Sequence, residues 1–277
     1  MGVVELAREP NLTVLFARAA VRGLRPSTGA PTLPDIGYAR SGIRVDRAHL
    51  AAYDRVCGYR LTDELPVTYP HLLVFGPQMA LLTSDGFPFP LIGLVHVANR
   101  ITWYRPLSAD EPLVALVHAT NLRPHERGSQ FDLVSEVHAD GVPVWHEVST
   151  YLRRNGSGGG HRPHPEPTGT PAAVWQVPAD IGRRYAGVSG DHNPIHLHRL
   201  TARMFGFRRA IAHGMWSMAR CLAYYEGRLP DAYTVDVRFQ LPILLPATVA
   251  MTAADDGFDL RDQRSGRPHL TGRLTSD

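Results

Sequence analysis

Two largely apolar segments of the sequence would each form a helix with no clean polar face. The first runs from His71 to Leu82 and the second from Gly214 to Tyr225. A helix that has no polar face must be covered on all sides by other parts of the protein, because exposed apolar surface costs free energy. The fold must therefore surround two separate helices.

Strand-like runs follow both helices in the same order. Residues 234–241 alternate apolar and polar side chains, and residues 94–103 form a similar run in the first half. Residues 131–138 and 142–151 flank Asp140-Gly141, a turn sequence typical of hairpins. The order of one helix followed by antiparallel strands occurs twice, which predicts an α+β fold built from two related halves.

The composition marks a boundary between the halves. Residues 155–171 begin with glycine and serine and continue with prolines, as linkers do. We interpret residues 1–154 as an N-terminal domain, 155–171 as a linker and 172–277 as a C-terminal domain. Each domain is long enough to have a core of its own.

The second half contains a short region with chemically useful side chains. A helix over about residues 181–186, capped by Asp180, would end where Gly190 takes a positive φ. A proline at position 194 prevents the chain from continuing that helix. Asp191 and His196 are therefore expected to converge through a loop, where a carboxylate and an imidazole can hold a water molecule and exchange protons with it.

The start of the second apolar helix supplies the complementary group. The first amide groups of a helix lack intrahelical partners and lie at the positive end of its dipole. The N–H of Gly214 is therefore expected to bind an oxygen atom that gains negative charge, and glycine allows close approach of a substrate.

Residues 185–196, with Ala202 and residues 211–215, resemble the hydratase-2 motif of MaoC-like (R)-specific enoyl thioester hydratases. The resemblance implies five catalytic positions, namely Asp191, His196, Asn193, Ser189 and Gly214. Asp191 and His196 would form the acid–base pair. Asn193 and Ser189 would orient that pair or its water, and the Gly214 amide would polarise the thioester carbonyl. We expect the carboxylate to activate the water and the imidazole to hold it.

The same resemblance implies a fold and a reaction. The fold is a double hot-dog, in which two antiparallel sheets each wrap a central helix. The reaction is that of a hydro-lyase in fatty acid metabolism, which adds water to a trans-2-enoyl thioester to give the (3R)-hydroxyacyl thioester or runs the reverse dehydration. It implies no metal and no redox cofactor.

The first half is expected to be a degenerate, structural or substrate-accommodating copy. When residues 53–61 are aligned with residues 185–193, Tyr59 falls at the position of Asp191 and Leu61 at that of Asn193. The first half also lacks the insertion of roughly ten residues found between His196 and Gly214. We therefore expect one active site per chain.

Composition narrows the partners. All 29 basic residues are arginines against 26 acids, and a net charge of +3 is too small to indicate nucleic acid. A thioester of coenzyme A or of an acyl carrier protein carries phosphate, which arginine binds well. We expect four residues to bind the substrate, namely His213, Arg203, Arg208 and Arg209.

The remaining signals concern location and assembly. Cys57 and Cys221 are too few for a disulfide framework, which favours the cytoplasm. Residues 1–25 lack the apolar core of a signal peptide or a membrane span and predict an N-terminal helix. Exposed sheet edges would allow two chains to pair as a homodimer.

Two other functions fit the same motif. A hot-dog thioesterase would direct an activated water at the carbonyl and release free thiol, and a noncatalytic subunit would bind acyl thioesters without turnover. The sequence leaves open the choice between coenzyme A and acyl carrier protein, the acyl chain length, the physiological direction and the order of proton transfers.

Overall fold

The structure is a computed structural model that describes residues 1–22, 31–91, 93–154 and 170–276. The chain forms two compact units. One comprises Met1–Asp46 and Asp63–Gly158, and the other comprises Arg47–Thr62 and Gly159–Asp277. No helix among the described residues is long and apolar enough to cross a membrane.

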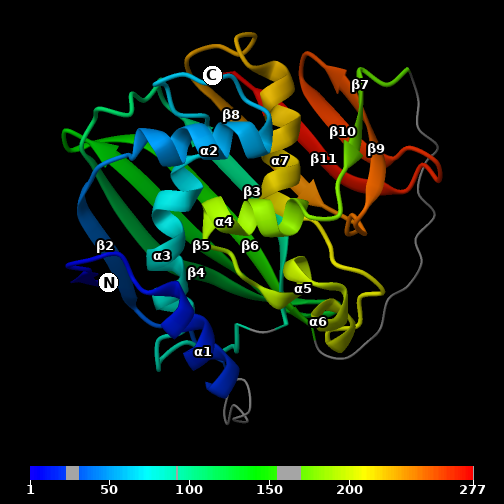
Figure 1. The fold of residues 1–277 in the computed structure, drawn as a ribbon. Helices are drawn as coiled ribbons and strands as arrows, with labels where there is room; N and C mark the ends of the chain where they lie inside the picture. The colour runs from blue at the N-terminus through cyan, green and yellow to red at the C-terminus, as the bar shows by residue number, and fades with distance from the viewer. Residues whose placement is uncertain (23–30, 92, 155–169, 277) are drawn as a thin grey trace. The chain divides into compact units, whose positions relative to one another are not determined.

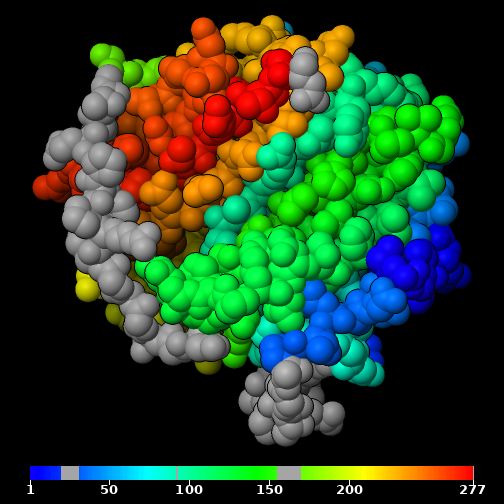
Figure 2. Space-filling view, turned by 180° about the vertical axis from the view of Figure 1, so that it is seen from behind, coloured from blue at the N-terminus to red at the C-terminus, as the bar shows by residue number. Residues whose placement is uncertain are grey.

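The first unit is built on a sheet of mainly antiparallel strands (Figure 1). In chain order its strands are β1 (Gly2–Glu5), β2 (Ile36–Ile43), β3 (Leu94–Trp103), β4 (Leu113–His125), β5 (Gly128–Ala139) and β6 (Val142–Arg154). In space they follow the order β1-β2-β4-β5-β6-β3. The predicted strand over residues 94–103 is confirmed, and the long strands β5 and β6 are at the surface in Figure 2.

The predicted hairpin joins β5 and β6. Asp140 and Gly141 have φ values of 51° and 78°, the pair of positive values that a tight two-residue hairpin turn requires. Glycine and aspartate tolerate that conformation better than other residues do. The turn places Glu147 of β6 opposite Ser135 of β5, so both side chains face the same side of the sheet.

Helix α3 (Pro70–Leu82) packs against β2, β4 and β5. Eleven of its thirteen residues are buried, which confirms that this helix has no polar face. Pro70 occupies the first turn, where its missing N–H removes no hydrogen bond. The N-terminal segment differs from the helix expected over residues 1–25: a short strand, β1, pairs parallel to β2, and helix α1 (Leu12–Arg22) lies in the connection that such a parallel pairing requires.

The second unit repeats the pattern. Its strands are β7 (Ala173–Val177), β8 (Tyr233–Phe239), β9 (Ala247–Ala254), β10 (Gly257–Asp262) and β11 (Pro268–Thr275). They pair antiparallel in the order β8-β11-β10-β9-β7. Helix α7 (Gly214–Leu222) packs against β11 and continues into the short 3-10 helix η1 (Ala223–Tyr225). Seven of the nine α7 residues are buried, as expected from its sequence.

Helix α2 (Arg47–Cys57) changes the expected domain organisation. The sequence assigned it to the N-terminal domain, but it belongs to the second unit, where it packs against α4 (Ile181–Ser189) and α7. Tyr53 of α2 lies with its ring centroid 6.3 Å from that of Tyr185, and the indole N–H of Trp216 donates to the Val56 carbonyl at 3.0 Å. The predicted linker falls almost wholly on residues 155–169, which are outside the described part of the chain.

Candidate active site

The site begins where α4 ends. Gly190 has φ of 74° and its N–H donates to the Ala186 carbonyl at 2.9 Å, so this glycine stops the helix as expected. Helix α4 continues to Ser189, three residues beyond the expected end. The expected cap is wrong, because the Asp180 side chain makes no capping hydrogen bond and only its backbone carbonyl accepts, from Arg184.

Asp191 stands at the centre of a braced turn. Its N–H donates to Ser189 Oγ at 3.2 Å, and its Oδ1 accepts from the Asn193 N–H at 3.1 Å. Asn193 Oδ1 in turn accepts from the Ile195 N–H at 3.4 Å and caps the one-turn helix α5 (Pro194–Leu197). Ser189 and Asn193 therefore hold the loop in which Asp191 lies, and α5 supplies His196.

His196 is buried and has one nitrogen fixed. Its Nδ1 lies 2.9 Å from the Ile211 carbonyl, which can only accept, so Nδ1 carries the proton. The lone pair of a neutral ring is then on Nε2. Burial lowers the pKa of His196 below its usual 6.5, although the charge of Asp191 acts in the opposite direction. His196 is therefore neutral at pH 7 and can accept a proton or a hydrogen bond through Nε2.

His213 joins these two residues. Its ring stacks on that of His196 with 3.7 Å between centroids, and its Nε2–H donates to the Asp191 backbone carbonyl at 3.0 Å. Burial, with the adjacent His196, lowers the pKa of His213 to about 3. Contact of His213 with substrate stays a prediction, and the structure shows in addition that His213 holds the loop around Asp191 in place. Sequence reasoning missed this role because the contact spans 22 residues.

Three potential ligand atoms of Asp191, His196 and His213 lie within 4.8 Å of one another. This spacing suits side chains that share one water molecule or one small ion. The hydrogen bond to the Asp191 carbonyl already engages Nε2 of His213. The geometry thus brings together the predicted acid–base pair and adds a second imidazole, that of His213, to it.

Gly214 begins α7 beside this cluster. The first hydrogen bond of the helix runs from the Ser217 N–H to the His213 carbonyl at 3.1 Å, so the Gly214 amide precedes the helical hydrogen-bond ladder. A Cβ atom at this position would lie 3.1 to 3.2 Å from the Phe239 ring. The absent side chain therefore makes room for the aromatic ring of β8, a reason for glycine that the sequence did not reveal.

The predicted substrate-binding arginines lie at the surface. Arg203 is on α6 (Arg199–Met204), and Arg208 and Arg209 are in the loop that follows; all three are exposed. Arg209 Nη1 donates to the Pro246 carbonyl at 3.3 Å. It also borders an open hollow of about 690 Å³ whose other lining residues are Gln176, Pro246, Ala247, Thr248, Asp262, Gln263 and Arg264.

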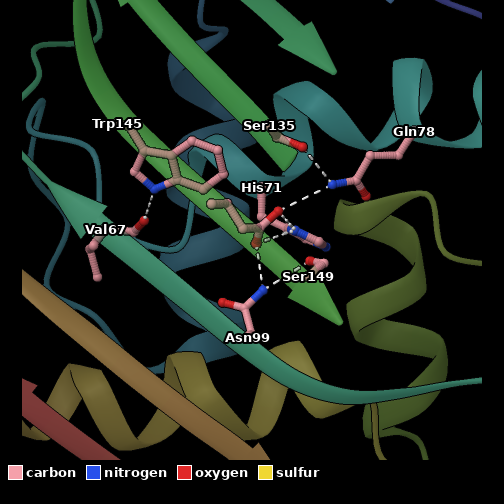
Figure 3. Close-up of polar contacts among 8 residues, drawn as sticks. Val67, His71, Gln78, Asn99, Ser135, Trp145 and Ser149 are labelled. Atoms are coloured by element: carbon pink, nitrogen blue, oxygen red, sulfur yellow. Dashed lines mark hydrogen bonds and ion pairs between the residues drawn. The ribbon is translucent and has the colours of Figure 1, made fainter. Parts of the chain in front are cut away.

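The first unit contains a second buried polar cluster, which the sequence analysis missed. Glu147 Oε1 lies 2.8 Å from His71 Nδ1 and accepts from Asn99 Nδ2 at 2.7 Å, and Gln78 Nε2 donates to Glu147 Oε2 at 3.1 Å. Figure 3 shows His71 and Gln78 of α3 and Asn99 of the sheet pointing toward this cluster. Glu147 is fully buried, which alone would raise its pKa, yet the His71 charge and these hydrogen bonds lower it.

The fold and the site together define a class of protein. A family model described as the MaoC like domain matches residues 162–270. A relative matches across 96% of the chain at 42% identity. The chain therefore belongs to the MaoC-like dehydratases and has the double hot-dog fold, in which each sheet packs on one buried helix.

That relative is 3-hydroxyacyl-thioester dehydratase X of Mycobacterium tuberculosis (strain ATCC 25618 / H37Rv), and the match covers 98% of it. The crystal structure of HtdX from the same organism is similar, with a TM-score of 0.77 and 40% identity, over 86% of this chain and 98% of that one. A MaoC-like dehydratase from Phytophthora capsici shares the fold, with a TM-score of 0.68 at 20% identity, over 87% and 95% of the two chains.

Proposed function

We propose that the protein is a hydro-lyase that interconverts trans-2-enoyl thioesters and (3R)-hydroxyacyl thioesters. The observation that carries this proposal is the convergence of Asp191, His196 and the start of α7 in one site. The similarity to a 3-hydroxyacyl-thioester dehydratase over nearly the whole chain supports it. The proposal needs no metal and no redox cofactor, because water addition is acid–base chemistry.

In the hydration direction, a water molecule lies between Asp191 and His196. The Asp191 carboxylate takes one proton from the water, while His196 Nε2 accepts the other water hydrogen as a hydrogen bond. The water oxygen forms a bond to Cβ, and Cα receives the proton that Asp191 took. The two side chains end the cycle in their starting states.

The thioester carbonyl requires its own partner in this reaction. Negative charge develops on its oxygen while the bond to Cβ forms. The Gly214 amide at the positive end of α7 stabilises that charge, and one such donor is worth about 3 kcal/mol. The dehydration direction uses the same groups in reverse order.

The test is whether the purified full chain turns over trans-2-enoyl thioesters. Turnover is measured as the loss of absorbance of the conjugated enoyl group. The Asp191→Asn variant should lose at least about 100-fold in kcat, because an amide cannot accept the proton. Chiral analysis of the product should show the (3R) alcohol. Release of free thiol at a similar rate would identify a thioesterase, and tight acyl-CoA binding without turnover would identify a binding subunit.

We also propose a cytoplasmic location. Cys57 and Cys221 are both free and buried, and burial raises the pKa of each thiol. Buried thiols of this kind are stable packing groups in a reducing compartment. Fractionation of the producing cells, with a cytoplasmic marker enzyme, tests this assignment.

A further inference from the structure

The segment between His196 and Gly214 contains the insertion of roughly ten residues that the first half lacks, and part of this segment has an unusual exposed surface. Helix α6 and the residues after it carry basic and apolar side chains on the outside. We name as the docking patch Arg199, Leu200, Arg203, Met204, Phe205 and Arg208. Within it, Leu200 is 63%, Met204 81% and Phe205 38% exposed.

Positive charge is concentrated in this part of the chain. Residues 181–225 hold seven arginines and one acid, Asp191, so the other 232 residues hold 22 basic and 25 acidic side chains. The ion pairs found among the described residues engage other arginines, and none engages an arginine of the docking patch. The patch therefore presents uncompensated positive charge to an acidic partner.

The patch is held against α5, the helix that carries His196. Within the patch region, Thr201 Oγ1 donates to the Pro194 carbonyl at 2.6 Å, which ties α6 to α5. After it, the Ile211 N–H donates to the Ile195 carbonyl at 3.1 Å, and the Ile211 carbonyl accepts from His196 Nδ1. A molecule bound to this loop is thus held next to the site where the thioester reacts.

We propose that the docking patch binds an acidic carrier protein that delivers the acyl chain on a phosphopantetheine arm. The proposal rests on the proposed function and selects one of its two substrate forms. Exposed apolar side chains interspersed with arginine are typical of a protein interface, whereas the phosphates of free coenzyme A gain nothing from Leu200 and Met204. A single six-residue helix is also short for an amphipathic helix that inserts into a membrane surface.

The experiment compares two substrates of the full chain that carry the same trans-2-octenoyl group. One is the thioester of an acidic bacterial acyl carrier protein and the other is the small N-acetylcysteamine thioester. Arg199→Glu and Met204→Asp should each lower the ratio of kcat/KM for the carrier substrate to kcat/KM for the small substrate by about tenfold. Arg238→Glu, an exposed change of equal charge on β8, should leave the ratio within about twofold.

Direct binding separates this proposal from the proposed function. The carrier protein charged with a saturated octanoyl chain should bind the wild type in a salt-dependent manner, and Arg199→Glu should weaken its Kd by about tenfold. That result supports docking even if no thioester is turned over. An unchanged ratio and an unchanged Kd overturn the proposal. If the variants lose kcat/KM equally with octenoyl-CoA, the patch is a phosphate subsite and the proposal is also overturned. Binding to anionic vesicles in place of the carrier protein overturns it as well.

Discussion

At the scale of single residues, the site depends on which nitrogen of each histidine carries a proton. Backbone carbonyls fix both rings, since His196 Nδ1 faces Ile211 and His213 Nε2 faces Asp191. Two stacked imidazoles 3.7 Å apart cannot both be charged without strong repulsion. Burial lowers the pKa of both rings and keeps them neutral, which leaves the lone pair on Nε2 of His196 able to accept a hydrogen bond.

The neutral state of His196 predicts a pH profile. Burial lowers its pKa below 6.5, so activity should stay constant as the pH falls to 6.5 and decline only at lower pH. The measurement is kcat/KM for the N-acetylcysteamine thioester against pH. An acid limb centred at or above 6.5 would contradict the neutral, buried imidazole. In the unfolded chain both histidines titrate normally, so the unfolding free energy should also fall as the pH drops below 6.5.

Glu147 carries a prediction about stability. It is a fully buried carboxylate whose charge is compensated by His71 and by two amide donors. Glu147→Gln removes the charge and leaves His71 with a weaker partner, and the loss should be about 3 kcal/mol in urea unfolding. The double variant with His71→Asn should cost less than the sum of the single changes, whereas strict additivity would mean that the two residues are not coupled.

Part of this residue-level picture was within reach of the sequence. The turn from Gly190 to Pro194 is local, so its glycine and proline predicted the convergence of Asp191 and His196. The buried cluster depends on strand pairing, which the sequence does not reveal. The spacing of two residues between Trp145, Glu147 and Ser149 could still have shown that these three side chains share the inward face of one strand. His213 binds a residue 22 positions away, and no local pattern signals such a contact.

At the scale of elements, the catalytic loop takes its position from the close contact of two helices. Gly182 of α4 lies against the backbone of α5. A Cβ atom on residue 182 would clash with the His196 carbonyl oxygen. Backbone atoms cannot move aside as a flexible side chain can. The glycine therefore sets how closely α4 approaches the residue that carries the imidazole.

A matched pair of glycines tests this packing. Gly182→Ala should push α5 away, lower kcat at least about tenfold and destabilise the fold by about 1–3 kcal/mol. Gly187→Ala lies on the same helix with nothing within 4 Å of the new Cβ, and it should preserve activity and raise stability by up to about 1 kcal/mol. Both are measured by turnover and urea unfolding, and equal behaviour of the two variants would refute the argument.

Most elements followed from local patterns, and the exceptions have physical reasons. The two apolar helices and the hairpin at Asp140-Gly141 are confirmed, because burial and turn geometry leave direct marks on sequence. Strand β1 was missed because its four residues are all exposed and show no alternation. The Asp180 cap was wrong because a suitable residue before a helix does not oblige its side chain to bond.

At the scale of the whole molecule, the chain order and the compact units differ. Helix α2 comes from the first half of the sequence but buries Leu50, Tyr53 and Cys57 within the second unit. The predicted boundary followed the composition of residues 155–171. It could not show that α2, which precedes this boundary in the sequence, packs in the second unit. The homodimer stays a prediction, which light scattering of the full chain tests.

The exchanged helix predicts how the chain responds to truncation. A fragment of residues 172–277 lacks α2. Tyr185 of α4 then loses its contact with Tyr53, and the Trp216 indole loses its hydrogen bond to the Val56 carbonyl. This fragment should be inactive and unfolded by circular dichroism. The full chain cut only within residues 155–171 by an inserted protease site should remain folded, and a stable, folded fragment of residues 172–277 would show that α2 is dispensable.

Helix α2 also has a consequence for synthesis on the ribosome. Its last residue is Cys57, whereas its partner α4 starts at Ile181, so 123 residues separate the two. At ordinary translation rates that interval lasts roughly ten seconds. Throughout it, the apolar face of α2 emerges without its partner, and the nascent chain must keep that face from aggregating. The protein should therefore depend on ribosome-associated chaperones more than its size alone would suggest.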